Sequence, residues 1–134
     1  MTQSLRAPAI AAARNGYAPH SRLQVGAALR SINGRVYAGC NVENASFSVG
    51  GCAERAAIAA AVLAEGKDFR LAAITVAAFD ADGTALPISP CGACRQALIE
   101  FGEDAEVSFL DGDGHWRCQT AASLMPFRFV FPSR

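Results

Sequence analysis

Residues 71–79 have the sequence Leu-Ala-Ala-Ile-Thr-Val-Ala-Ala-Phe, which is apolar at every position except Thr75. A strand with one face in solvent alternates apolar and polar residues, whereas a strand covered on both faces is apolar along most of its length. The stretch therefore predicts a central strand of a sheet that has helices on both faces.

The segments on either side of this strand supply the rest of the sheet and its covering helices. Asn33-Gly34 is a strong hairpin signal, because both positions of the expected turn need positive φ. Gly66 ends one predicted helix, and Ser89-Pro90 begins another with a good N-cap and a favoured first residue. The expected elements are a helix ending near Asn15, strands over 23–31 and 36–41, a helix over 52–65, a strand over 71–79, a helix from Ser89-Pro90 to about Gly102, and strands over 107–110 and 115–118. This order predicts a single domain over residues 1–134, with a mixed sheet between two layers of helices.

The charges of the chain balance, with twelve basic and twelve acidic residues and no cluster of Lys or Arg. Such a surface has no electrostatic footprint for nucleic acid or for a membrane surface, so we expect neither as a partner. Charged residues or glycine interrupt the longest apolar runs, and we expect no membrane span. Five cysteines, an odd number, and no recognisable export signal favour a reducing cytoplasm over a disulfide framework.

Three cysteines and one glutamate form the pattern that carries chemistry. Cys91 and Cys94 are three residues apart on a predicted helix and therefore share one face, while Cys52 lies two residues before Glu54. Three thiolates are one ligand short of a closed structural zinc site, so Zn²⁺ would keep a position for a water that ionises near neutral pH. Glu54 points away from the direction of Cys52 and is free to move protons. We predict a hydrolytic zinc centre with Glu54 as its proton carrier.

Three thiolates would leave this zinc centre with a net negative charge that its surroundings must offset. Both ligand groups fall at predicted helix N-termini, which contribute partial positive charge. Arg55, three residues after Cys52, can donate hydrogen bonds to the ligand sulfurs and so orient them and offset their charge. The alternative for Arg55 is a surface salt bridge.

The cysteines have two other interpretations. A Cys-x-x-Cys at the start of a helix can be a dithiol redox pair, and Cys40 or Cys118 could complete a structural zinc site. Neither interpretation gives a role to the Cys-x-Glu element. We expect Cys40 and Cys118, both in predicted strands, to be small buried hydrophobic residues.

Five segments around these motifs occur in a characteristic order. They are Tyr17-Ala18-Pro19-His20-Ser21, Val25-Gly26-Ala27-Ala28-Leu29, Gly39-Cys40-Asn41-Val42-Glu43-Asn44-Ala45-Ser46, Cys52-Ala53-Glu54-Arg55 and Ser89-Pro90-Cys91-Gly92-Ala93-Cys94-Arg95-Gln96. From Tyr17 to Phe129 the chain resembles the small, homotetrameric class of cytidine deaminases. The resemblance implies a three-layer α/β/α sandwich with a five-stranded mixed sheet and one Zn²⁺ per chain.

The resemblance also implies which residues bind substrate. Asn41 and Glu43 would hydrogen-bond the ribose hydroxyls, and the alternative is that they satisfy nearby backbone groups. Backbone groups near Ala53 and Ser89 could recognise the edge of the pyrimidine. These polar groups suit a neutral nucleoside, and the sequence has neither a Gly-rich phosphate cradle nor a basic cluster for a nucleotide.

Three apolar positions of the expected pocket need separate mention. The family usually has Phe at the position of Leu23 and often has Tyr at the position of Phe47, so these two departures affect the choice of substrate. The segment Leu124-Met125-Pro126-Phe127-Arg128-Phe129 resembles the family's Leu-Leu-Pro-x-x-Phe and places Phe129 at its aromatic position.

The tail Phe127-Arg128-Phe129-Val130-Phe131 is strongly apolar for the end of a chain. Such a segment is expected to be buried on another chain, which together with the resemblance predicts a homo-oligomer, a tetramer, whose pockets are completed by neighbours. The alternative for Phe127 and Phe131 is a last edge strand on the chain's own core.

The sequence thus predicts a zinc-dependent hydrolase that converts cytidine and deoxycytidine to uridine and deoxyuridine and releases ammonia, in pyrimidine salvage. The alternative within this class is a deaminase of a modified cytosine nucleoside, such as a blasticidin-type antibiotic. The alternative outside it is a non-catalytic zinc or thiol module.

Overall fold

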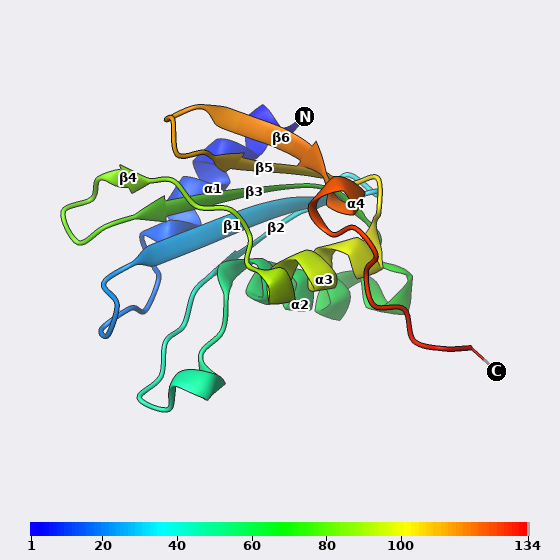
Figure 1. Ribbon diagram of the computed structural model, residues 1–134, viewed down its shortest axis with the longest axis horizontal. Coiled ribbons are helices and arrows are strands. Elements are labelled where there is room, and N and C mark those ends of the chain that lie inside the picture. The colour runs from blue at the N-terminus through cyan, green and yellow to red at the C-terminus, as the bar shows by residue number, and fades with distance from the viewer. Residues whose placement is uncertain (134) are drawn as a thin grey trace.

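Strand β3 (Leu71–Phe79) lies in the middle of a mixed sheet, as the apolar stretch predicts. The computed structural model describes residues 1–133. β3 pairs antiparallel with β1 (Gln24–Ser31) and parallel with β5 (Glu106–Leu110). The edges of the main path are β2 (Val36–Cys40) and β6 (Trp116–Thr120), which gives the order β2-β1-β3-β5-β6 (Figure 1).

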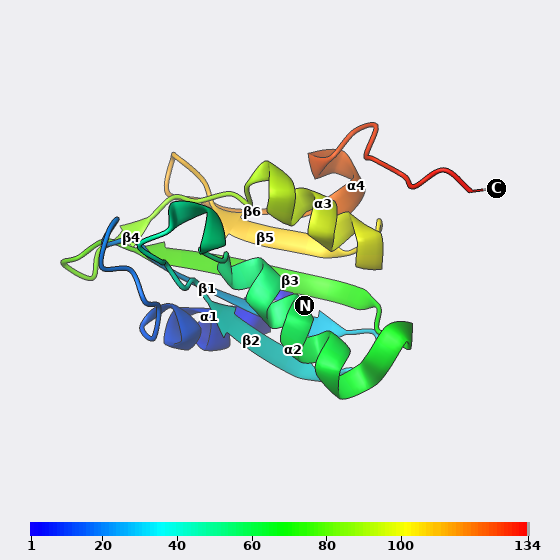
Figure 2. The same ribbon diagram turned by 90° about the horizontal axis from the view of Figure 1, so that it is seen from below.

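Helices cover both faces of this sheet. One face is covered by α1 (Arg6–Ala13), and the other by α2 (Ala53–Glu65) and α3 (Gly92–Phe101), which lie side by side (Figure 2). The alternation of side chains along β3 divides its residues between two apolar layers. Ala73 and Ala77 pack in the layer that contains α1, whereas Ile74 packs in the layer of α2 and α3. The predicted three-layer α/β/α class is confirmed.

Short elements complete the chain. They are η1 (Thr2–Leu5) before α1, η2 (Phe47–Val49) in the loop between β2 and α2, η3 (Gly66–Asp68) after α2, β4 (Ala85–Leu86) after β3, and α4 (Ala121–Leu124) after β6. β4 pairs with the end of β3, so the sheet has six strands and not the five expected. The extra strand forms because the chain turns back at Gly83, which has a φ of +80°. The residues that follow this turn, Ala85 and Leu86, then pair with the end of β3. None of the helices described over residues 1–133 has the length and apolar character needed to cross a membrane.

The hairpin between β1 and β2 is present, but its turn differs from the predicted one. Only Gly34 has positive φ in this turn, at +86°, and Asn33 does not. The Gly34 N–H donates to the Ser31 carbonyl at 2.9 Å, and the Ser31 N–H donates to the Arg35 carbonyl at 2.9 Å. The loop therefore has three residues and needs left-handed backbone at one glycine alone.

The helix expected from Ser89-Pro90 begins three residues later, at Gly92, with Cys91 as its N-cap residue. Ser89 does not cap it, because the Arg95 guanidinium donates to the Ser89 hydroxyl at 3.3 Å and to the Pro90 carbonyl at 2.8 Å. Residues 89 and 90 are thus held as a loop against the helix that follows.

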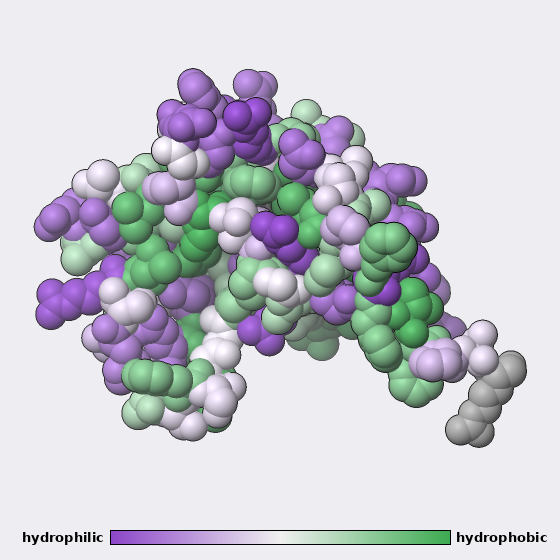
Figure 3. Space-filling model, viewed as in Figure 1, coloured by the Kyte–Doolittle hydropathy of each residue, from purple (hydrophilic) through white to green (hydrophobic). Residues whose placement is uncertain are grey.

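The expected burial of Cys40 and Cys118 in their strands is wrong, and so is the alternative of a last edge strand for Phe127 and Phe131. Cys40 is half-buried and Cys118 is exposed, because both belong to strands at the edges of the sheet. The C-terminal tail forms no strand, and Phe127 and Phe131 are exposed at 105% and 81% of their reference areas. Apolar side chains accordingly gather on the surface of the tail and of the η2 loop (Figure 3). The tail does not pack on the core of its own chain.

Candidate active site

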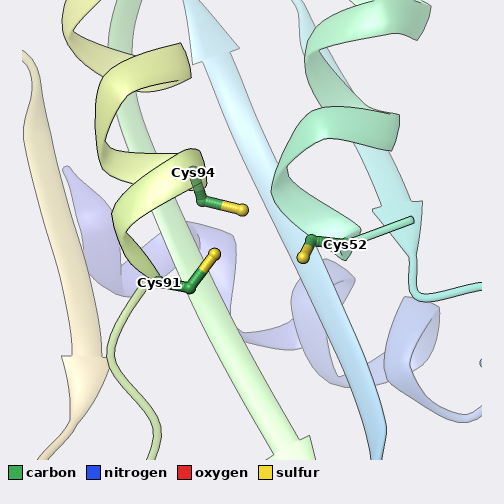
Figure 4. A group of neighbouring side chains, drawn as sticks. All are labelled: Cys52, Cys91 and Cys94. Carbon is green, nitrogen blue, oxygen red and sulfur yellow. The ribbon is translucent and has the colours of Figure 1, made fainter. Parts of the chain in front are cut away.

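Three cysteines from two helices converge at one point beside the sheet. The Sγ atoms of Cys52, Cys91 and Cys94 all lie within 4.8 Å of one another. Figure 4 shows the sulfurs turned toward the space between the start of α2 and the start of α3. Three thiolates about 2.3 Å from one tetrahedral zinc ion lie roughly 3.8 Å apart, so small rotations of these side chains would suffice to bind Zn²⁺. The donor set and its spacing fit zinc.

The backbone explains why these sulfurs meet. Cys52 and Cys91 are the N-cap residues of α2 and α3, and both have extended backbone, with ψ of 153° and 170°. Cys94 follows in the first turn of α3 and is completely buried. The free N–H groups at both helix starts therefore surround the cluster, and their partial positive charge favours thiolates there.

The two cysteines of α3 have opposite tendencies to ionise. Burial raises the pKa of the Cys94 thiol well above its usual range, and the nearby Glu54 carboxylate raises it further. Burial also opposes ionisation of Cys91, but hydrogen bonds from the Cys94 backbone and from neighbouring thiols outweigh it and lower the Cys91 pKa. A cation in the cluster would compensate the charge that Cys94 cannot carry alone.

Arg55 donates a hydrogen bond from Nη2 to the Cys52 Sγ at 3.4 Å. Hydrogen bonds to the sulfurs of Cys52 and Cys94 raise the pKa of the guanidinium, so it remains charged beside the cluster. The alternative for Arg55 was a surface salt bridge, and no salt bridge of Arg55 occurs among residues 1–133.

Glu54 lies in the first turn of α2 with only 5% of its surface exposed. Burial raises the pKa of this carboxyl, and the opposing hydrogen bonds and the charge of Arg55 only partly offset that effect. Glu54 and two of the cysteines line one pocket of about 270 Å³. A carboxyl group and two sulfurs of the cysteine cluster therefore face the same volume, which has room for a small ring.

Five of the predicted substrate residues line this same pocket. They are Leu23, Asn41, Glu43, Ala53 and Ser89. Val25, Val42, Gly50, Gly51 and Ile88 also line it, and sequence reasoning did not select them. Val25 could have been found, because it is the first inward residue of β1 beyond Leu23.

Phe47 and Phe129 do not reach the pocket of their own chain. Phe47 is 79% exposed on η2. Its ring meets the His20 ring edge-on, with the two ring centroids 5.5 Å apart, and lines a neighbouring hollow. Phe129 is 67% exposed on the tail. Its backbone N–H and carbonyl are both bound by the side-chain amide of Gln96, at 3.3 and 3.0 Å. The structure of one chain thus separates these two aromatic residues from the other substrate residues.

Asn41 and Glu43 both bond to local backbone while they line the pocket. The Asn41 side chain accepts from the Val25 N–H at 2.9 Å and donates to the Leu23 carbonyl at 2.7 Å. The Glu43 carboxylate accepts from the Ser21 hydroxyl and from the N–H groups of His20 and Ser21. Hydrogen bonds from Ser21 lower the pKa of Glu43, so it is a carboxylate at neutral pH.

Sequence reasoning gave no role to Arg95 and Gln96, although both belong to the motif around Cys94. Arg95 donates to the Leu124 carbonyl at 3.2 Å as well as to the Ser89-Pro90 loop, and Gln96 binds the tail. Their position directly after a metal-ligand candidate was the available signal. They join the cysteine-bearing helix to the pocket loop and to the C-terminal segment.

Comparison with known proteins agrees with this geometry. Residues 1–110 match a family model described as the cytidine and deoxycytidylate deaminase zinc-binding region. The cytidine deaminase of Halalkalibacterium halodurans is 40% identical over 129 residues, which cover 96% of this chain and 93% of that protein. The crystal structure of cytidine deaminase from Burkholderia pseudomallei has a TM-score of 0.83 and 42% identity, and the match covers 96% of this chain and 99% of that one.

A more distant relative is the blasticidin-S deaminase of Bacillus cereus, which is 31% identical over 108 residues covering 79% of this chain and 76% of that protein. The identity is higher, and the coverage greater, for the two cytidine deaminases. The fold, the cysteine cluster and these similarities lead to one conclusion: the chain belongs to the cytidine and deoxycytidylate deaminase family.

Proposed function

We propose that this protein is a zinc-dependent hydrolase that deaminates cytidine and deoxycytidine. The observation that carries the proposal is the pocket in which Cys52, Cys91 and the buried carboxyl of Glu54 face the same small volume. Water adds to C4 of the cytosine ring, the bond from C4 to the exocyclic nitrogen breaks, and ammonia and the uridine are released. The reaction needs a metal site and a proton carrier, and this pocket brings candidates for both together.

Cys52, Cys91 and Cys94 would hold one zinc ion per chain. When bound by three protein ligands, zinc supplies a Lewis acid that lowers the pKa of a water molecule to near neutrality. Arg55 offsets part of the negative charge of the three sulfurs through its hydrogen bond to Cys52. The two helix N-termini around the cluster add to this effect.

Glu54 moves the protons of the reaction. It accepts a proton from the attacking water, delivers it to N3 of the ring, and assists protonation of the departing amine. Its buried position in the first turn of α2 keeps the carboxyl at the pocket wall and away from bulk water. One side chain can thus serve as base and acid in succession.

Asn41 and Glu43 bind the ribose. Each uses part of its hydrogen-bonding capacity on the backbone, and each keeps free capacity: one N–H on the Asn41 amide and about one acceptor position on the Glu43 carboxylate. A hydroxyl group accepts from the first and donates to the second. A phosphate close to Glu43 would be repelled, so nucleosides are preferred over their monophosphates.

The cytosine ring is held by apolar contact with Leu23 and by backbone groups near Ala53 and Ser89, which lie on the wall of the pocket. Leu23 fills less volume than the Phe usual in the resembling family. The ring then depends more on an aromatic residue from elsewhere.

The active unit is a homotetramer in the cytoplasm, and neighbouring chains supply Phe47 and Phe129. Two observations support this arrangement. Both rings are exposed on their own chain, and the backbone of Phe129 is held at both its N–H and its carbonyl by Gln96. An apolar ring on a fixed backbone is suited to insertion into another surface.

The test is a panel of possible substrates with a zinc determination on the same preparation. We expect one zinc per chain and deamination of cytidine and deoxycytidine, which is measured as the loss of the cytosine absorbance. Free cytosine and cytidine monophosphate should be much poorer substrates. A higher kcat/KM for blasticidin S than for cytidine would favour the antibiotic, and zinc without turnover of any of these compounds would favour a non-catalytic module.

A further inference from the structure

Ser21 lies in the loop before β1 and is bonded directly to Glu43 on the pocket wall. Its hydroxyl donates to Oε2 of the carboxylate. Its backbone N–H and that of His20 donate to Oε1, at 3.0 and 2.9 Å. Residues more than twenty positions apart in the sequence are thereby joined at one carboxylate.

The direction of the Ser21 hydroxyl is set by a second hydrogen bond. The Leu23 N–H donates to Ser21 Oγ at 3.0 Å, so a lone pair of the oxygen is occupied and its proton is directed to Glu43. Arg22, between Ser21 and Leu23 in the chain, has a φ of +62°, which is unusual for a residue with a side chain. Its N–H donates to the Ala18 carbonyl at 2.9 Å and so closes a turn. This local geometry brings the hydroxyl within reach of both neighbours.

These groups occupy most of the acceptor positions of the Glu43 carboxylate. A carboxylate offers about four acceptor positions, and the loop occupies two on Oε1 and one on Oε2. One position remains on Oε2, the oxygen that Ser21 holds with its side chain. Without that hydroxyl, Oε2 would have no hydrogen-bond partner among residues 1–133. The carboxylate would then be held only by the two N–H groups on Oε1, and Oε2 could change its direction.

We propose that Ser21 is a positioning residue that directs the one free acceptor position of Glu43 toward a ribose hydroxyl. The inference rests on the proposed function, because it assigns a purpose to the contact between Glu43 and a nucleoside. Ser21 touches no reacting atom. Its effect is on the binding of the sugar and not on the bond that is broken.

A purely structural role for Ser21 predicts a different outcome. If the hydroxyl only fastened the loop before β1, its loss would disturb Leu23 and the whole pocket. All substrates would then suffer alike, with or without sugar hydroxyls. The positioning role predicts an effect that depends on those hydroxyls.

The experiment compares Ser21→Ala, Ser21→Thr and Ser4→Ala with the zinc-loaded wild type, on cytidine and on 2′,3′-dideoxycytidine. Ser4→Ala makes the same chemical change at an exposed hydroxyl that bonds to the Met1 carbonyl and Arg30, and it should behave as wild type. Ser21→Ala should lower kcat/KM for cytidine about tenfold, mainly through KM, which corresponds to one hydrogen bond to a charged group. For the dideoxy compound the change should be about twofold or less.

Two further measurements make the result specific. Ser21→Thr keeps a hydroxyl and should recover most of the cytidine activity, and adding Ser21→Ala to Glu43→Gln should cost little more than Glu43→Gln alone. Equal losses on both substrates, or no loss on cytidine, would overturn the inference.

A titration of the Glu43 carboxyl by carbon NMR gives a readout that does not depend on turnover. The pKa of Glu43 should be higher in Ser21→Ala than in wild type, because the first cause of its lowering, the Ser21 hydroxyl, is gone. An unchanged pKa would overturn the inference, whether or not the protein deaminates cytidine. A wild type that does not act on cytidine would refute the proposed function instead.

Discussion

Replacing Gly39 with alanine tests whether β2 sets the position of the helix that carries Cys52 and Glu54. Gly39 lies on β2 directly under the first turns of α2. A Cβ atom there would be 2.4 Å from the Ala57 nitrogen and 2.6 Å from the Ala53 carbonyl oxygen. Both are backbone atoms of α2, so no side-chain rotation can relieve the contact, and the helix itself must move.

The size of the effect follows from these distances. Ordinary van der Waals contact of a Cβ begins near 3.4 Å, so α2 must shift by about 1 Å at its start. Overpacking of this kind costs about 1–3 kcal/mol of folding free energy, and each kcal/mol lowers the thermal midpoint by roughly 3–6 °C for a chain of this size. A shift of about 1 Å in the group that positions Glu54 should lower kcat about 100-fold.

The assay combines thermal unfolding at one fixed protein concentration with zinc content and kcat on cytidine. Gly112→Ala is the matched control, because nothing lies within 4 Å of a Cβ built there and its backbone is not left-handed. The control should resemble wild type in all three measurements. A Gly39→Ala protein with an unchanged midpoint and full activity would refute the reasoning, and a lowered midpoint with full activity would show that β2 supports the fold but not the site.

Four other substitutions test separate parts of the molecule. Glu54→Gln should keep one zinc per chain and lower kcat by about 10²–10⁴-fold, since it removes the proton carrier and no ligand, and a wild-type rate would contradict this role. Cys94→Ala should lose zinc and activity together, and tightly bound zinc in that variant would mean that another group is the third ligand. Phe129→Ala should raise KM for cytidine without changing zinc content, and dilution should lower the activity of the wild type as subunits separate; a fully active monomer by light scattering would exclude the shared pocket. Hydrogen bonds from the His115 backbone and then the Arg117 guanidinium lower the pKa of Asp111 to about 2 from its ordinary 3.8, so its carboxylate stabilises the fold above pH 4 and ceases to do so as the pH falls through 2. Asp111→Asn should therefore lower the thermal midpoint at pH 7 and converge with wild type near pH 2, and an equal difference at both pH values would contradict the assignment.

Some properties of this protein depend on residues close together in the sequence, and these could be predicted. The nearly unbroken apolar stretch of β3 required cover on both faces, and helices lie on both. The spacing of Cys91 and Cys94 places two sulfurs on one turn of helix. Arg55 reaches Cys52 because residues three apart on a helix are neighbours. Local geometry was sufficient in each case.

Other local predictions failed where a nearby residue formed a hydrogen bond that the pattern did not indicate. Ser89 was expected to cap α3, but its hydroxyl is bound by Arg95 and the helix begins at Gly92. The Asn33-Gly34 turn has another form, because the pairing of Ser31 with Arg35 leaves three residues in the loop. In both places a hydrogen bond that the local pattern does not reveal decided the conformation.

The sequence by itself determined the class of fold, through the order of its elements and the apolar stretch of β3, and it placed Cys91 and Cys94 on one turn of a helix through their spacing. The sequence also predicted that Cys52 belongs with Cys91 and Cys94, but only the tertiary structure brings their sulfurs within 4.8 Å of one another. Only the tertiary structure decided that Ser21 holds Glu43 and that the Phe129 ring lies outside the pocket of its own chain. Such contacts depend on strand order, on the placement of two helices on one face of the sheet and on the path of the tail. These are set by the packing of the whole chain, in which each segment competes for the same apolar surface and the same hydrogen-bonding groups.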